Sequence, residues 1–101
     1  MDLKIAQWNC DGVRTKMGEL IDFLSSRNVD LVALNETKLA ENRDFRFRGY
    51  SVVRKDGRNS QGGVAIATRD TISFQRIALP QLSSLEAVAT RLVDSTMVVC
   101  T

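Results

Sequence analysis

The feature that most constrains the fold is the succession of three apolar patterns within residues 3–34. A short apolar run, LKIAQWN (3–9), precedes a segment with helical spacing, and a second apolar run follows at residues 30–34. The apolar residues of the middle segment recur at i, i+3, i+4 and i+7, on one face of a helix: Met17, Leu20, Ile21 and Leu24. Asn28 is placed to end this helix. Strand, helix and strand in this order predict a βαβ unit with parallel strands.

The remainder of the chain predicts antiparallel strands. Runs at 49–54 and 64–68 flank the polar loop KDGRNSQGG, whose glycines permit conformations closed to other residues. The runs LEAVATRLV and TMVVCT flank Asp94-Ser95, a typical hairpin connection. We therefore expect an α/β fold with a mixed β-sheet of five or six strands and one covering helix. Because one helix cannot cover both faces of an apolar sheet, we expect the chain to be the first part of a larger domain, or to bind a partner through its open face.

Composition and charge exclude several classes of protein. The 101 residues are 44% hydrophobic and 26% charged, which is typical of one small soluble globular domain. The net charge of +2 is too small to indicate a polyanion partner. No apolar run approaches the roughly 18 residues of a membrane span, so no membrane partner is expected.

The cysteines and the lack of histidine narrow the chemistry. Cys10 and Cys100 have neither disulfide-framework nor metal-site spacing, so we expect buried thiols and an intracellular protein. Since the chain contains no His, carboxylates and amides remain as its site chemistry.

Polar side chains follow the two parallel strands where each strand ends. Asn9 ends the first run, and Glu36 comes directly after the second. Ligands collect beyond the carboxyl ends of parallel strands, so these two residues should meet at one edge of the sheet. Either residue alone is more often a turn former or a solvated loop residue. Together, an amide and a carboxylate suit Mg²⁺, with Mn²⁺ as the alternative hard cation, and do not suit zinc.

The order of these motifs resembles a known family. Residues 5–39, IAQWNCDGVRTKMGELIDFLSSRNVDLVALNETKL, are similar to the start of the endonuclease/exonuclease/phosphatase family, whose DNase I-like fold opens with a strand ending in Trp-Asn, a helix, and a strand ending in a Gln-Glu-Thr type motif. GYSVVRKDGRNSQGGVAIAT and LEAVATRLV look like later segments of the family. The likeness is strongest to the apurinic-type endonuclease domain of non-LTR retrotransposons.

The resemblance implies that residues 1–101 form the N-terminal half of a four-layer αββα sandwich of about twice this length. It assigns metal binding and catalysis to Glu36 and Asn9, while Asn35 stands where the family commonly has Gln. Thr37 would be either a supporting hydrogen-bonding residue or a turn residue. The family's Tyr-x-Pro-Pro, Gly-Asp-x-Asn and Ser-Asp-His motifs would follow residue 101, so we expect little activity from the chain alone.

The loop arginines and three other residues have two interpretations each. Arg54 and Arg58, near the glycine loop, could bind the DNA phosphate backbone or form a solvated face; Arg46 and Arg48 favour the solvated face. Gly62-Gly63 lacks phosphate-loop spacing and favours the start of a strand. Trp8 is expected in the core rather than stacked on a base, and Glu86 is expected to face solvent rather than join the site.

These residues support three functional hypotheses. The first is the N-terminal part of a Mg²⁺-dependent endonuclease that nicks DNA, nuclear if the retrotransposon likeness holds. The second is a non-catalytic half-domain that binds a partner or self-associates through its uncovered sheet face. The third is a phospholipid or phosphoinositide phosphodiesterase of the same fold.

Overall fold

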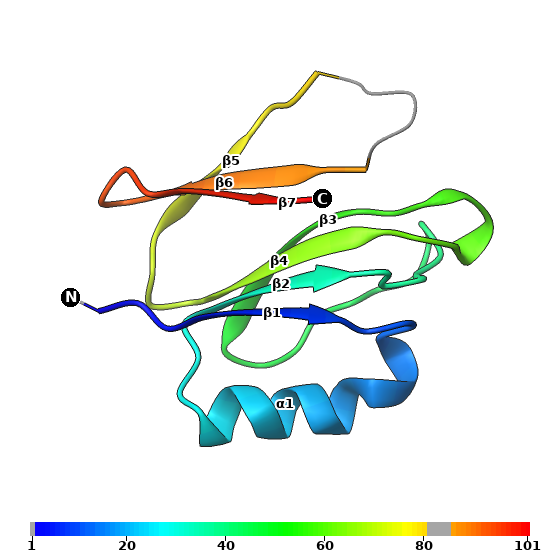
Figure 1. The fold of residues 1–101 in the computed structure, drawn as a ribbon, viewed down its shortest axis with the longest axis horizontal. Coiled ribbons are helices and arrows are strands. Elements are labelled where there is room, and N and C mark those ends of the chain that lie inside the picture. The colour runs from blue at the N-terminus through cyan, green and yellow to red at the C-terminus, as the bar shows by residue number, and fades with distance from the viewer. Residues whose placement is uncertain (1, 81–85) are drawn as a thin grey trace.

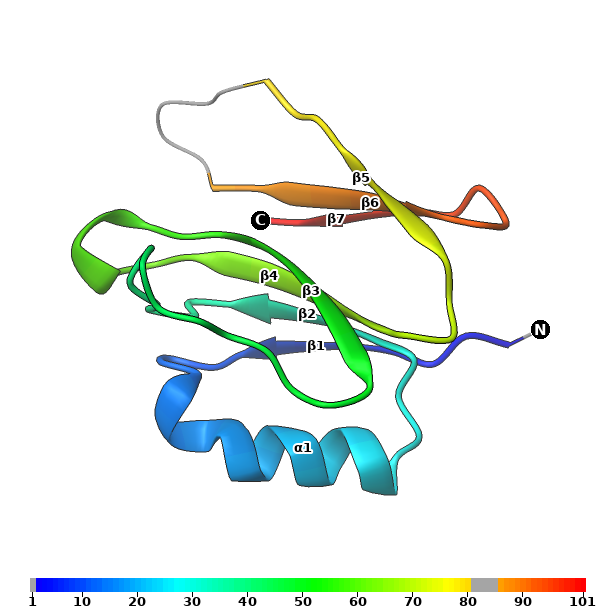
Figure 2. The same ribbon diagram turned by 180° about the vertical axis from the view of Figure 1, so that it is seen from behind.

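The helix and strands of the protein form three layers, seen in a computed structural model that describes residues 2–80 and 86–101 (Figures 1 and 2). A helix covers one face of a four-stranded sheet, and a three-stranded sheet covers the other face. In chain order the elements are β1 (Ile5–Asn9), α1 (Met17–Ser26), β2 (Leu31–Asn35), β3 (Tyr50–Lys55), β4 (Val64–Arg69), β5 (Phe74–Ile77), β6 (Val88–Leu92) and β7 (Met97–Cys100), with short 3-10 turns at Arg14–Lys16 and Arg58–Ser60.

The first sheet has the order β1-β2-β4-β3 and is mixed. β1 and β2 are parallel, with Ile5 opposite Leu31, whereas β4 runs antiparallel to both β2 and β3. The predicted βαβ unit is therefore confirmed. It places the carboxyl ends of β1 and β2 side by side, as the site prediction requires.

The strand patterns alone predict one sheet with five or six strands, which is wrong, whereas the part of an αββα sandwich that the family resemblance implies is confirmed by the two stacked sheets. The described residues form seven strands in two sheets, and the second sheet, with the order β5-β6-β7, is antiparallel throughout. The extra strand, β5, has the sequence FQRI, whose two central polar residues are exposed. So short and half-polar a segment carries no clear strand pattern. The predicted hairpin between β6 and β7 is present, although Leu85, the first residue of the predicted run, lies outside the described residues.

The helix ends as its sequence indicates. Asn28 follows the C-cap Arg27 and has a left-handed backbone, with φ of 53°. The Val29 N–H donates to the Leu24 carbonyl at 3.0 Å, and the Asn28 N–H donates to Ser25 at 3.3 Å. This pair of bonds is a Schellman motif, and it satisfies carbonyls that the end of the helix would otherwise leave without donors.

Two hydrophobic cores hold the layers together. The first lies between α1 and the first sheet and includes Leu20, Leu24 and Cys10, with Trp8 packed against it as predicted. Ile21, expected on the same helix face, is instead 47% exposed. The second core lies between the two sheets and includes Cys100. Both cysteines are free and buried, which confirms that they fill cores.

Two surface segments complete the description. Residues 45–48 keep their alternation, with Phe45 buried and Arg46 exposed, although this segment is not a strand. The second sheet is the outermost layer in both ribbon views, and Met97 and Val99 on β7 are 51% and 55% exposed. Within the described ranges, no helix is long and apolar enough to cross a membrane.

Candidate active site

The carboxyl ends of β1 and β2 form the edge where the sequence places the candidate site. Asn9 lies opposite Asn35, the last residue of β2. The pairing continues past the strands, because the Cys10 N–H donates to the Asn35 carbonyl at 3.0 Å and the Gly12 N–H donates to the Glu36 carbonyl at 2.8 Å. Asn9 and Glu36 therefore lie at one rim of the sheet, on adjacent segments and one residue out of register.

The segment that carries Glu36 is also held from its other side. The Thr37 N–H donates to the Gly63 carbonyl at 3.1 Å, and the Lys38 N–H donates to the Gly62 carbonyl at 2.7 Å. These two glycines directly precede β4, which confirms the prediction that they start a strand. The backbone around Glu36 is thus fixed between two neighbouring segments.

Glu36 has a conformation that few residues other than glycine adopt. Its φ is 53°, in the left-handed region. The five residues before it form the regular strand β2 (Leu31–Asn35), and the side chain of Glu36 itself is exposed. If the alternation of the strand continued, Glu36 would point to the other face of the sheet from Asn35. Asn9 is paired with Asn35 and shares its face, so Glu36 would then point away from Asn9. The left-handed turn breaks that alternation. A non-glycine residue held in this region costs about 1–3 kcal/mol, and such residues cluster at functional sites.

Sequence reasoning missed Asp11, a second carboxylate at the rim. Its Oδ1 lies 2.5 Å from the Lys38 Nζ. The hydrogen bond and charge of Lys38 hold the pKa of the Asp11 carboxyl below its usual range, and Asp11 in turn raises the pKa of Lys38. The signal was present in the polar cluster after β1, where Asp11 follows Asn9 by two residues.

Asn35, which stands where the family commonly has Gln, ties the rim to both of its neighbours. Its Oδ1 accepts a hydrogen bond from the Gln7 Nε2 at 3.0 Å. Its Nδ2 donates to the Thr101 carbonyl and lies 3.8 Å from the Cys100 Sγ. This side chain therefore connects the end of β2 with β1 in the same sheet and with β7 in the other.

Thr37 supports the rim through its backbone rather than its hydroxyl. The side chain is buried, and its Oγ1 has no hydrogen-bond partner among the described residues. A Cβ atom added to Gly63 would lie 2.4 Å from this oxygen, so the two segments pack closely. A buried hydroxyl without a partner is uncommon and marks a place where a further polar group would be stabilising.

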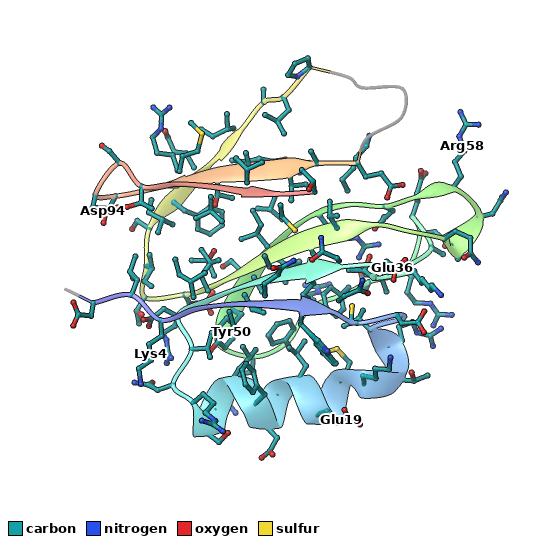
Figure 3. The ribbon with its side chains drawn as sticks, viewed as in Figure 1. Lys4, Glu19, Glu36, Tyr50, Arg58 and Asp94 are labelled. Carbon is teal, nitrogen blue, oxygen red and sulfur yellow. The ribbon has the colours of Figure 1, made fainter. Side chains whose placement is uncertain are left out.

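The two predicted phosphate-binding arginines have different environments. The Arg54 guanidinium is committed to Asp56 through two bonds of 3.0 Å, and to the Ala40 carbonyl at 3.0 Å. Arg58 is exposed, and Figure 3 shows it at the same end of the molecule as Glu36. A groove of about 510 Å³ adjoins it, lined by Ala40, Glu41, Gly57, Arg58, Asn59 and Ser60. Arg58, rather than Arg54, is therefore open to a ligand.

The prediction that Glu86 faces solvent is wrong. Glu86 precedes β6 in the second sheet, and its Oε1 accepts a hydrogen bond from the Gly63 N–H at 2.7 Å. The residue is half-buried rather than exposed. Alternation along one strand cannot reveal a contact with a loop of another sheet, and that contact decides the environment of Glu86.

Comparison with known families identifies the chain. A sequence model of the endonuclease/exonuclease/phosphatase family matches residues 6–100. The chain belongs to this family. The chain is similar in sequence to the probable RNA-directed DNA polymerase from transposon X-element of Drosophila melanogaster, with 37% identity over 76 residues. That match covers 72% of the chain and 8% of the relative.

The fold of the chain is similar to that of solved structures. The chain resembles an AP endonuclease from Archaeoglobus fulgidus, with 30% identity and a TM-score of 0.66, over 91% of the chain and 38% of that structure. It has the fold of a 3′ phosphatase, NExo, from Neisseria bound to a product DNA hairpin, with 23% identity and a TM-score of 0.71 over 97% of the chain. The chain therefore has the DNase I-like fold. It spans 40% of the Neisseria structure, so the similarity covers only a part of that fold.

The donors at the rim fit the divalent metals that the endonuclease/exonuclease/phosphatase family generally uses. Glu36 offers an exposed carboxylate and Asn9 an exposed amide, both with oxygen donors. In the described part of the chain, no three His, Cys, Asp or Glu side chains lie close enough together to hold a metal. Mg²⁺ needs only one or two protein carboxylates and keeps several waters, so this sparse oxygen set suits it and does not suit zinc.

Proposed function

We propose that residues 1–101 are the N-terminal portion of a Mg²⁺-dependent endonuclease domain that nicks DNA, of the retrotransposon or apurinic-site type. The observation that carries the proposal is that Asn9 and Glu36 lie at one rim, where the adjacent parallel strands β1 and β2 end. The similarity to a transposon polymerase and to an AP endonuclease supports DNA as the substrate.

The rim and the adjoining loop have separate roles in this proposal. Glu36 and Asn9 would hold the metal, with Mn²⁺ as an alternative to Mg²⁺. When bound, the metal supplies positive charge that offsets the negative charge of the phosphate and of the leaving 3′ oxygen. The backbone hydrogen bonds of residues 36–38 fix the position from which the Glu36 side chain extends, so the backbone of this segment needs little ordering when DNA binds. Arg58 would bind a backbone phosphate without reading sequence.

The 101 residues alone should be nearly inactive. Hydrolysis needs a group that orients or deprotonates the attacking water, and this chain has no His to do so. The paired Asp11 and Lys38 side chains neutralise one another within the described structure. We therefore place the activity in a complete domain, to which this chain contributes the metal-binding rim.

The experiment is Glu36→Gln in the complete protein, assayed by nicking of supercoiled plasmid in the presence of Mg²⁺. Losing a metal-binding carboxylate should cost several kcal/mol of transition-state stabilisation, or roughly a thousand-fold in rate. The matched control is Glu19→Gln, which removes the same charge from the outer face of α1 (Figure 3). Undiminished nicking by a folded Glu36→Gln protein would refute the proposal.

A second candidate function is self-association. The outer face of the second sheet exposes Met97 and Val99 on β7, a strand at the edge of that sheet. Exposed edges and apolar faces of this kind pair readily with a second copy. Size-exclusion chromatography of the 101-residue chain tests this: we expect a dimer that Val99→Lys converts to a monomer, and a monomeric wild-type chain would exclude it.

A further inference from the structure

The loop of residues 56–63, called here the Arg58 loop, holds an unusual backbone. It joins β3 to β4, and its tip contains Asn59 and Ser60 in the left-handed region, with φ of 53° and 58°. Two consecutive residues in this region are costly, and they persist only where the surrounding structure determines them. The contacts at the two ends of the loop therefore decide its shape.

The first end is fixed from within the first sheet. Asp56 accepts the bonds from Arg54 described above, and the same guanidinium donates to the Ala40 carbonyl at 3.0 Å. Both charged side chains are largely buried. This ion pair joins the base of the Arg58 loop to the opposite wall of the groove.

The second end is fixed by Glu86 from the other sheet. Its Oε1 accepts the hydrogen bond from the Gly63 N–H at 2.7 Å, a charge-assisted bond. A Cβ atom at Gly62 would lie 2.6 Å from Oε1, and one at Gly57 would lie 2.6 Å from Oε2. Gly62 therefore leaves room for the carboxylate and Gly63 donates to it. A Cβ atom at Gly57 would meet the Gln61 carbonyl oxygen first, at 1.7 Å, so Gly57 is required mainly by the loop's own backbone.

The same glycines connect the Arg58 loop to the rim. While the Gly63 N–H binds Glu86, the Gly63 and Gly62 carbonyls accept hydrogen bonds from Thr37 and Lys38, immediately after Glu36. We propose that Glu86 is a positioning residue, which locks the Arg58 loop so that Arg58 contacts a DNA phosphate next to the Glu36 rim. This inference rests on the proposed function.

The variants are Glu86→Ala, Arg58→Ala and the double variant, made in the complete protein, with Glu19→Gln as the charge-matched control. Each single variant should raise KM for DNA about tenfold, the worth of one hydrogen bond to a charged group, with kcat nearly unchanged. Because Glu86 acts through Arg58, the double variant should be no worse than the more severe single variant. Glu86→Gln retains an oxygen acceptor for Gly63 and should restore most of the affinity.

The results separate this proposal from the proposed function. A wild-type protein that does not nick DNA refutes the proposed function. Hydrogen exchange then tests the positioning role, since Glu86→Ala should speed exchange in residues 56–63 and leave α1 unchanged. An unchanged KM in an active protein, effects of Glu86 and Arg58 that multiply in the double variant, or unchanged exchange in the loop would each overturn the positioning role.

Discussion

Replacing Asp56 by Ala isolates the energetic role of the ion pair at the base of the Arg58 loop. In the wild type, the Arg54 guanidinium makes close contacts with both oxygens of Asp56, at 3.0 to 3.3 Å. The two side chains are 19% and 10% exposed. Asp56→Ala leaves the guanidinium largely buried, and among residues 2–80 and 86–101 the Ala40 carbonyl is its one remaining acceptor.

The size of the effect follows from this burial. Removing one partner of a buried pair costs about 3–5 kcal/mol, because the other charge stays buried without compensation. Arg54 keeps some solvent and one acceptor, so the lower end, about 3 kcal/mol, applies. Since small domains are stable by only about 5–15 kcal/mol, this loss is a large share of the total.

A second ion pair provides the control. Arg46 and Asp44 are also two residues apart and 3.3 Å from one another, but their side chains are 80% and 87% exposed. Asp44→Ala should change the free energy of unfolding by less than about 0.5 kcal/mol.

Urea unfolding followed by circular dichroism compares the two variants. With a slope of about 1–3 kcal/mol per molar urea, Asp56→Ala should lower the midpoint by about 1–3 M. Asp56→Asn, which keeps one oxygen acceptor, should fall between Asp56→Ala and the wild type. Equal midpoints for Asp56→Ala and Asp44→Ala would show that burial of an ion pair does not determine its contribution to the free energy of unfolding.

Two further predictions concern glycine and pH. Gly18→Ala, in α1 with open space around the added Cβ, should stabilise the protein by about 0.5–1 kcal/mol. Gly63→Ala should destabilise it by about 2 kcal/mol or more, because Gly63 has a φ of 90° and its added Cβ would lie 2.4 Å from Thr37 Oγ1. Thermal unfolding measures both variants, and a reversed order of stability would contradict the packing described. Burial raises the pKa of the Cys10 and Cys100 thiols above the ordinary 9.0, so the folded state holds protons that the unfolded chain releases. The contribution of the two thiols to stability is complete below pH 9.0 and is lost as the pH rises through their folded pKa values. The urea midpoint of the wild type should therefore fall above pH 9.0, and it should fall less when both cysteines are Ala. A wild-type midpoint that does not change with pH would contradict this sign.

The predictable part of the fold is the part set by local pattern. Helical spacing between two apolar runs fixes the βαβ unit, and the βαβ unit places Asn9 and Glu36 at neighbouring strand ends. Asn28 is recognisable as a helix terminator because Asn tolerates the left-handed conformation. These features depend on residues close together in the chain.

The remaining features depend on contacts between distant segments. The division into two sheets follows from how β5 to β7 pack on β4 and β2, which no local period records. Arg54 and Arg58 are indistinguishable by composition, yet Asp56 engages one of them and leaves the other exposed. Glu86 alternates like a solvent-facing residue and is held by a loop of the other sheet.

Glu36 shows why a strained residue at a strand end is informative. Nothing in ALNET marks a turn by Gly or Pro, so local preference favours continuing the strand, and the observed φ of 53° contradicts it. Conflicts between local preference and the final structure are expected where function is selected over stability. Here the strain is sustained by bonds from Gly12 to Glu36, and from Thr37 and Lys38 to the glycines before β4. Because both sides of the segment are fixed, the carboxylate at its centre is presented by a backbone that cannot relax into the strand.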